Sequence, residues 1–209
     1  ETNLVRVSVR ASGRKAAGYI RANDHGFRPG QPQTRLEDMD RDGVYAQIIY
    51  SPMTTQLQIQ NPERRAACLR AYNDWAADFN KLAPSRLLLL SHRPSHDPKA
   101  ARDELERVTR LGHRGAIVGQ QEAPEPIFDD SWRGFWDTAN EIGIPIHTHL
   151  GPAPRSLQMK LGSWRMPATV AIIPMQLDEA LVGMVMSGML EQRPRVKLVL
   201  GESGLGWVP

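Results

Sequence analysis

Short apolar runs separated by helix-forming segments constrain the fold of this chain more than any other feature. The runs begin near residues 44, 86, 115, 144 and 196, and none alternates cleanly between apolar and polar side chains. Strands that are apolar on both faces are typical of a parallel sheet with helical crossovers. The expected helices span residues 35–41, 62–82, 98–111, 131–142 and 168–190, the last as one helix or a pair. The pattern therefore predicts an α/β fold, either an open doubly wound sheet or a closed eight-stranded barrel.

Length and motifs favour the barrel. No G-x-G-x-x-G motif follows the first apolar run, so a dinucleotide-binding sheet has no support. A complete (β/α)8 TIM barrel takes about 250 residues, and the 209 residues of this chain contain five strand-like runs. We therefore expect residues 35–209 to form the central portion of a TIM barrel, about strands 2 to 6. Residues 1–34 are expected to form an irregular loop or hairpin arm that follows a missing first strand.

Composition argues against several classes of protein. Apolar residues make up 41% of the chain and charged residues 23%, which is typical of a globular protein. The formal net charge is +3, from 26 basic and 23 acidic residues that are interleaved, so we expect no nucleic-acid partner. No apolar run approaches the about 18 residues of a membrane span, so we expect no membrane partner. The single cysteine, Cys68, fits a reducing compartment, and we expect a cytoplasmic location.

Two histidines at the end of a strand-like run are the sharpest chemical feature. His147 and His149 are separated by one residue, and residues two apart in a strand point to the same face. Chemistry gathers at the carboxyl ends of the strands in parallel α/β folds. Neutral imidazole is a good ligand for zinc and similar divalent ions. The pair is therefore a candidate metal site, and the alternative is one hydrogen-bonded strand-end histidine and one packing histidine.

Other polar residues follow the remaining strands. Glu202 comes directly after the last run, where an unpaired buried carboxylate is costly. It is a candidate ligand or general base, and the alternatives are an ion pair with Arg93 or Arg155, or exposure in a loop. His92 and Arg93 are candidates for binding an acidic substrate, because arginine matches a carboxylate; the alternative is a solvated rim. Two loop tryptophans near the expected mouth are further candidates for substrate contact, namely Trp164 and Trp207.

Four stretches carry a resemblance to a known family. They are residues 35–44 (RLEDMDRDGV), 72–79 (YNDWAADF), 143–151 (GIPIHTHLG) and 196–209 (VKLVLGESGLGWVP). The chain resembles the amidohydrolase-related metal-dependent TIM-barrel family, whose members include aminocarboxymuconate-semialdehyde and resorcylate-type decarboxylases alongside hydrolases. The resemblance covers about residues 33–209 and implies a metal ion at the carboxyl mouth of the barrel.

The resemblance also implies roles for individual residues. The metal-binding histidine of the family's fifth strand corresponds to His149, which precedes Gly151 at the family's spacing. The first-strand H-x-H or E-x-H motif and the eighth-strand Asp would lie outside this sequence. Many relatives carry His-x-Gly-Gly after the sixth strand, whereas this chain carries Glu202, Ser203 and Gly204. Glu202 is thereby expected to replace the catalytic histidine as a base, ligand or orienting residue.

The expected function follows from the resemblance. We expect a metal-dependent hydrolase that acts on a small carbonyl or carboxylate substrate through a metal-activated water. The expected catalytic residues are Glu202 and His149, and the expected cofactor is a divalent ion, zinc first, with manganese or iron as alternatives. One alternative is a non-oxidative decarboxylase of a hydroxylated aromatic or unsaturated acid. A second is a non-catalytic barrel that has lost its metal. The partners expected are a small-molecule substrate and further copies of the chain, as a dimer or larger homo-oligomer.

Overall fold

Parallel strands in chain order form the centre of the fold. The structure, a computed structural model, describes residues 30–50, 59, 61–120, 123–150 and 162–204. One two-stranded sheet pairs β1 (Gln47–Ile49) with β2 (Leu87–Leu89). A second sheet has the order β3–β4–β5–β6, and every neighbouring pair in it is parallel. Its strands are β3 (Ser91–His92), β4 (Ala116–Ile117), β5 (Ile146–His149) and β6 (Leu198–Gly201).

The two sheets share one extended segment of chain. Residues 87–89 pair with β1, and residues 91 and 92 pair with β4. Between them, the N–H of Leu90 donates to the carbonyl of Ile49 at 3.0 Å, and the N–H of Ser91 donates to the carbonyl of Gly115 at 3.3 Å. The five predicted strands therefore lie side by side in sequence order. That arrangement is the central part of a TIM barrel, as predicted.

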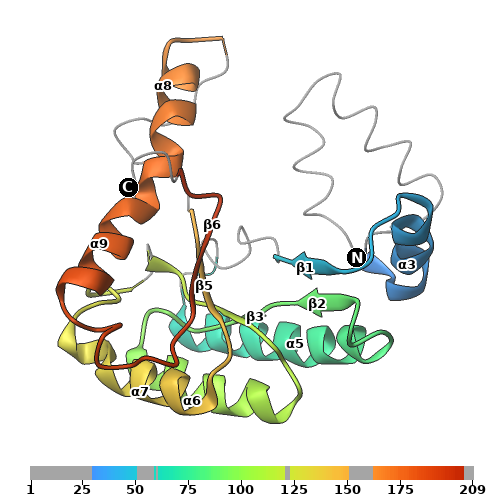
Figure 1. Ribbon diagram of the computed structural model, residues 1–209, viewed down its shortest axis with the longest axis horizontal. Coiled ribbons are helices and arrows are strands. Elements are labelled where there is room, and N and C mark those ends of the chain that lie inside the picture. Colours follow the sequence, from blue (N-terminus) through green and yellow to red (C-terminus); the bar gives the residue numbers. More distant parts are fainter. Residues whose placement is uncertain (1–29, 51–58, 60, 121–122, 151–161, 205–209) are drawn as a thin grey trace.

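Helices cross over between the strands and cover one side of them (Figure 1). They begin where the sequence supplies caps. The side chain of Asn61 accepts from the N–H of Arg64, and the side chain of Asp97 accepts from the N–H groups of Lys99 and Ala100. The helices are α3 (Pro32–Arg41), α5 (Pro62–Lys81), α6 (Pro98–Arg110), the 3₁₀ turn η3 (Asp130–Trp132), α7 (Arg133–Ile142), α8 (Arg165–Ile172), the 3₁₀ turn η5 (Ile173–Leu177) and α9 (Asp178–Met186).

Two helix boundaries differ from the prediction. Helix α3 begins at Pro32, so residues 32–34 belong to a helix and not to the predicted irregular arm. Proline lacks an N–H but suits the first helical turn, which explains the early start. Residues 1–29 of that arm lie outside the described residues. The segment 168–190, predicted as one helix or a pair, is a pair with different outer bounds, since α8 begins at Arg165 and α9 ends at Met186. Pro174 falls in the 3₁₀ turn that separates the two helices.

Within the described part of the chain, no single helix is long and apolar enough to cross a membrane. Helix α8 and the segment Met175–Met186, which meet at a bend of 41°, pass that test only when they are taken together.

The strands separate a helix-facing side from an inner face. Ile146 is fully buried in a core cluster with residues of η3, α6, α7 and α9, including Trp132, Leu105 and Trp136. Successive strand residues point to opposite sides of a sheet. His147 and His149 therefore lie on the other side of β5 from Ile146. We call this side the inner face, because it corresponds to the lumen of the barrel.

Candidate functional site

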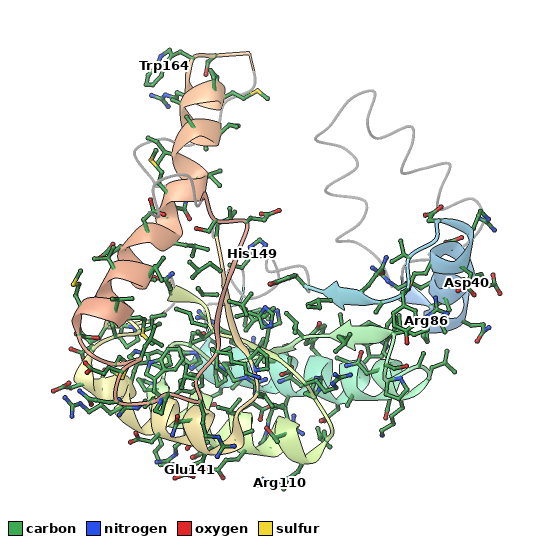
Figure 2. All side chains as sticks on the ribbon, in the orientation of Figure 1. Asp40, Arg86, Arg110, Glu141, His149 and Trp164 are labelled. Carbon is green, nitrogen blue, oxygen red and sulfur yellow. The ribbon has the colours of Figure 1, made fainter. Side chains whose placement is uncertain are left out.

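The inner face carries a cluster of side chains at the carboxyl ends of β1, β5 and β6. His147 pairs in register with Val199, and His149 pairs with Gly201. Tyr50 follows β1 directly and contacts both histidine rings, with centroid separations of 5.5 Å to His147 and 5.1 Å to His149. Figure 2 shows His149 beside the strands in the middle of the molecule. The expectation that both histidines share one face is confirmed by their register.

The ring of His149 is held with one nitrogen available. Its Nδ1 lies 2.8 Å from the carbonyl oxygen of Leu150. A carbonyl only accepts, so Nδ1 carries a hydrogen and Nε2 is the free nitrogen of the neutral ring. Nε2 lies 3.5 Å from Oε2 of Glu202. Histidines that ligate metals commonly donate their other nitrogen to a backbone carbonyl in the same way, so the geometry is compatible with a ligand role.

Glu202 adopts an unusual backbone conformation. Its φ is 60°, and it is the one non-glycine residue with positive φ among the described residues. Such a conformation costs of order 1–3 kcal/mol and is concentrated at functional sites. The side chain of Glu202 is 66% exposed. The alternative of a buried ion pair with Arg93 is therefore wrong, because Glu202 faces His149 and solvent; Arg155 lies outside the described residues.

His147 is engaged by a partner that the sequence analysis missed. The hydroxyl of Tyr50 lies 2.7 Å from Nδ1 of His147. Burial lowers the pKa of His147 to about 4 and raises the pKa of Tyr50, so both groups are neutral near pH 7. Tyr50 ends the apolar run at residues 44–50 and belongs to no polar motif. The one signal in the sequence that points to the mouth is that Tyr50 immediately follows a strand.

His92 and Arg93 are both buried. His92 pairs with Ile117, which pairs with His147, so His92 lies on the inner face. Burial, together with the smaller effects of the charges of Arg93 and His149, lowers its pKa to about 3. Its ring lies edge-on to Tyr72 with a centroid separation of 5.5 Å. The alternative of a solvated rim is wrong for both residues, because their exposed fractions are 2% and 0%.

Arg93 lies on the helix-facing side, one position after His92. Its Nη2 donates to Oγ of Ser91, while Nε and Nη1 are buried without a hydrogen-bond partner among the described residues. Burial lowers its pKa to about 9, and the charge of Glu104 on α6 opposes that shift. This position does not support the prediction that Arg93 binds an acidic substrate at the mouth, because strand alternation turns it away from His149.

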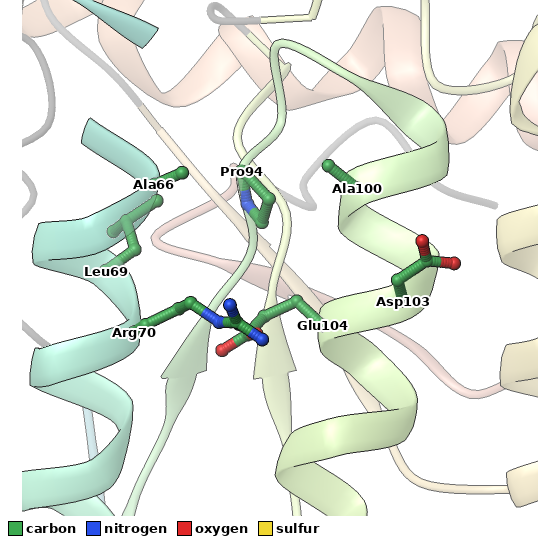
Figure 3. Close-up of a pocket in the computed structure, with 7 residues that line it drawn as sticks. All are labelled: Ala66, Leu69, Arg70, Pro94, Ala100, Asp103 and Glu104. Atoms are coloured by element: carbon green, nitrogen blue, oxygen red, sulfur yellow. The ribbon is translucent and has the colours of Figure 1, made fainter. Parts of the chain in front are cut away.

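The helix-facing side also contains a pocket of its own. It lies between α5 and α6 and has a cavity volume of about 240 Å³. Arg70 and Glu104 point toward one another across it (Figure 3), with Nε of Arg70 at 3.4 Å from Oε2 of Glu104. The Glu104 carboxylate also accepts from Asn73 and Arg107. The Arg70–Glu104 ion pair joins α5 to α6, whereas the Arg107–Glu104 pair lies within α6. None of the residues that line the pocket belongs to the cluster around His149, so the two sites are separate.

The two predicted tryptophans do not join the site in the described residues. Trp164 is 68% exposed and lies at the outer end of α8, away from His149 (Figure 2). Its position does not support a contact with a substrate beside His149. Trp207 lies outside the described residues.

The residues that reach the mouth could hold part of a metal site. His149 Nε2 and a Glu202 oxygen both present lone pairs, and at 3.5 Å they face one another. Two lone pairs at this distance repel unless a cation, either a proton or a metal ion, lies between them. Within the described ranges, no group of three or more His, Cys, Asp or Glu side chains is placed to hold a metal ion. Further ligands would have to come from elsewhere in the protein.

Parallel strands, helical crossovers and an imidazole–carboxylate pair at the strand ends define a portion of a TIM barrel with a polar site at its mouth. The family model described as "Amidohydrolase" matches residues 5–209. The chain belongs to this amidohydrolase family, as its motifs predicted.

Several named proteins and solved structures are similar to the chain. Gamma-resorcylate decarboxylase of Rhizobium sp. is 29% identical over 182 residues, which cover 83% of this chain and 55% of that protein. The chain thus spans about half the length of the curated relatives it matches. A crystal structure of dihydroxybenzoic acid decarboxylase from Polaromonas sp., with bound manganese and the inhibitor 2-nitroresorcinol, is 23% identical with a TM-score of 0.66, covering 82% of this chain and 55% of that one.

A third similar protein carries no decarboxylase name. The crystal structure of an amidohydrolase from Mycobacterium avium subsp. paratuberculosis is 19% identical with a TM-score of 0.70, covering 84% of this chain and 48% of that one. At this identity the likeness to the solved structures shows the fold alone.

Proposed function

We propose that the protein is a metal-dependent decarboxylase of a hydroxylated aromatic acid. The observation that carries the proposal is the His149 ring, whose Nδ1 is bonded to the Leu150 carbonyl and whose Nε2 faces the Glu202 carboxylate. The resemblance by itself favours hydrolysis first, with decarboxylation as the alternative. The names of the matching relatives favour decarboxylation, so we reverse that order.

The metal is proposed on the chemistry of the donor atoms. His149 would hold a divalent ion through Nε2, with the remaining ligands outside the described residues. The ion would supply positive charge that stabilises the carboxylate and phenolic oxygens of the substrate. The Polaromonas enzyme holds manganese, while a histidine nitrogen also suits zinc. We therefore propose a divalent ion, with manganese placed ahead of the zinc first expected.

Glu202 is proposed to carry the proton that decarboxylation requires. The bond between the ring carbon and the carboxylate breaks, carbon dioxide leaves, and the ring carbon gains one proton. Glu202 donates that proton and recovers it from water, which reaches the exposed carboxyl group. Its Oε2 lies 3.5 Å from Nε2 of His149, so the proposed acid and the proposed ligand lie next to one another at the mouth.

The test is decarboxylation of 2,6-dihydroxybenzoate by the intact protein, together with its metal content. We expect release of carbon dioxide that a chelator abolishes and added manganese or zinc restores. His149→Ala should lose both metal and turnover, whereas Glu202→Gln should keep the metal and lose about 10²–10⁴-fold in kcat. His113→Gln is the control, because His113 is buried at the start of β4 and bonds the backbone of Asn73, away from the mouth.

Other outcomes would decide against the proposal. Hydrolysis of esters or lactones without decarboxylation would restore the hydrolase, with Glu202 as the general base. A protein that holds less than about a tenth of an equivalent of metal after reconstitution, and turns over neither substrate class, would be a non-catalytic barrel.

A further inference from the structure

The His149 ring is enclosed on two sides by groups that come from different strands. The ring of Tyr50, from the end of β1, lies against it with a centroid separation of 5.1 Å and an angle of 50° between the planes. The backbone of Gly201, from the end of β6, lies so close that a Cβ atom there would be 2.8 Å from Cδ2 of His149. The position of the Tyr50 ring therefore limits the orientations that the His149 ring can adopt.

Tyr50 is in turn anchored by His147. The Tyr50 hydroxyl and Nδ1 of His147 are 2.7 Å apart, and the two rings meet edge to face at 77°. His147 is 3% exposed and lies in the middle of the sheet, where β5 pairs with both β4 and β6. A side chain at such a position has little freedom to move, so it is a rigid anchor for the tyrosine.

This contact also bears on whether His147 is a metal ligand. Nδ1 of His147 is occupied by the Tyr50 hydroxyl. Its Nε2 points toward Gly115, since a Cβ on that glycine would lie 3.3 Å from it. Gly115 immediately precedes β4, at the opposite end of the strand from the mouth. Neither nitrogen of His147 is thus directed at the space between His149 and Glu202.

We propose that Tyr50 is a positioning residue for His149, and that His147 is the anchor of Tyr50 and not a second metal ligand. The inference rests on the proposed function, since it takes His149 as the ligand. Groups that orient a ligating histidine typically change metal affinity by 10–100-fold when they are removed. Tyr50→Phe keeps the ring but loses the anchor, so it is expected to weaken metal binding by about that factor.

The experiment measures metal affinity and folding of the intact protein. Metal is removed by chelation, and Mn²⁺ and Zn²⁺ are titrated separately by calorimetry into wild type, Tyr50→Phe, His147→Phe and the double variant. We expect both single variants to bind the metal about 10–100-fold more weakly. The double variant should be no weaker than the weaker single variant, because all three lack the same hydrogen bond. Tyr72→Phe is the matched control, since its hydroxyl also bonds within the protein, to the Leu90 carbonyl at 3.1 Å; its thermal stability should fall while its metal affinity stays within twofold.

The outcomes separate this inference from the proposed function. If wild type binds metal and His149→Ala does not, but Tyr50→Phe binds as tightly as wild type, the positioning role is wrong and the proposed function stands. If His147→Phe abolishes binding as His149→Ala does, while Tyr50→Phe leaves it intact, His147 is a ligand and the inference is again overturned. If His149→Ala binds metal like wild type, the proposed function itself fails. Should Tyr50→Phe not fold, the size of the His147→Phe effect decides the question: binding that is weakened about 10–100-fold supports the anchor role, whereas binding that is abolished as in His149→Ala, or left unchanged, overturns it.

Discussion

Replacing Gly201 by alanine tests how tightly the mouth of the barrel is built. The added methyl group would lie 2.8 Å from Cδ2 of His149, and 3.2 Å and 3.3 Å from Cε1 and Cζ of Tyr50. Ordinary contact begins near 3.4 Å, so the imidazole must move by several tenths of an ångström. The ring cannot turn away freely, because Nδ1 is bonded to the Leu150 carbonyl and Tyr50 blocks the other side.

Two opposing contributions determine how much Gly201→Ala changes the free energy of unfolding. Forcing a methyl group into a filled site costs about 1–3 kcal/mol. Alanine restricts the unfolded chain more than glycine does, which returns about 0.4–1 kcal/mol. We therefore expect Gly201→Ala to lower the free energy of unfolding by about 1–2 kcal/mol. Because the displaced group is His149, we also expect weaker metal binding and slower turnover.

The assay is urea denaturation of the metal-free protein, followed by metal titration of the folded variant. Gly134→Ala is the control, because Gly134 lies within α7 and the nearest atom to an added Cβ is Nη1 of Arg102 at 3.7 Å. That change should be neutral or stabilise by up to about 1 kcal/mol, since alanine favours helix. If Gly201→Ala were as stable as Gly134→Ala and bound metal like wild type, the enclosure of His149 would be refuted.

Three further predictions concern the buried groups. His92 has a pKa of about 3 in the folded protein, and an unfolded histidine has a pKa of about 6.5. As the pH falls below 6.5, the unfolded state therefore takes up the proton first, and the free energy of unfolding should decrease by up to about 1.4 kcal/mol per pH unit. Urea titrations at pH 5 and pH 7 measure this decrease. If His92→Gln showed the same decrease between the two pH values as wild type, the prediction would be wrong. Glu104→Gln removes the carboxylate that is ion-paired with Arg70 and Arg107 and whose charge opposes the lowered pKa of buried Arg93. It should lower the free energy of unfolding by about 1–3 kcal/mol in the same assay, and an unchanged free energy would mean that these contacts do not stabilise the fold. Gly183→Ala would drive a methyl group into the ring of Phe128, with an expected loss of about 1–3 kcal/mol, and a melting temperature equal to wild type would show that the ring moves aside at no cost.

The order of the strands and helices is predictable from the amino-acid pattern alone. Five apolar runs predicted the five parallel strand positions, because strands buried on both faces need no alternation. Asn61, Asp97 and Gly143 marked helix ends through capping and a left-handed φ, the last observed at 77°. The spacing of His147 and His149 also placed both rings on one face, since strand alternation is a local property of the backbone.

The contacts between side chains at the mouth depend on how the chain folds in three dimensions. Tyr50 and His147 are 97 positions apart in the chain, and no local pattern encodes a contact between them. Arg93 was expected at the mouth. Because side chains alternate along a strand and Arg93 follows His92 by one residue, it lies on the helix-facing side, where it is buried near Glu104. Trp164 was moved away from the mouth by the direction of α8. The spacing of residues along a strand predicts which side chains share a face of the sheet. Which of them contact one another depends on how strands that are distant in the sequence come together when the sheet curves into a barrel.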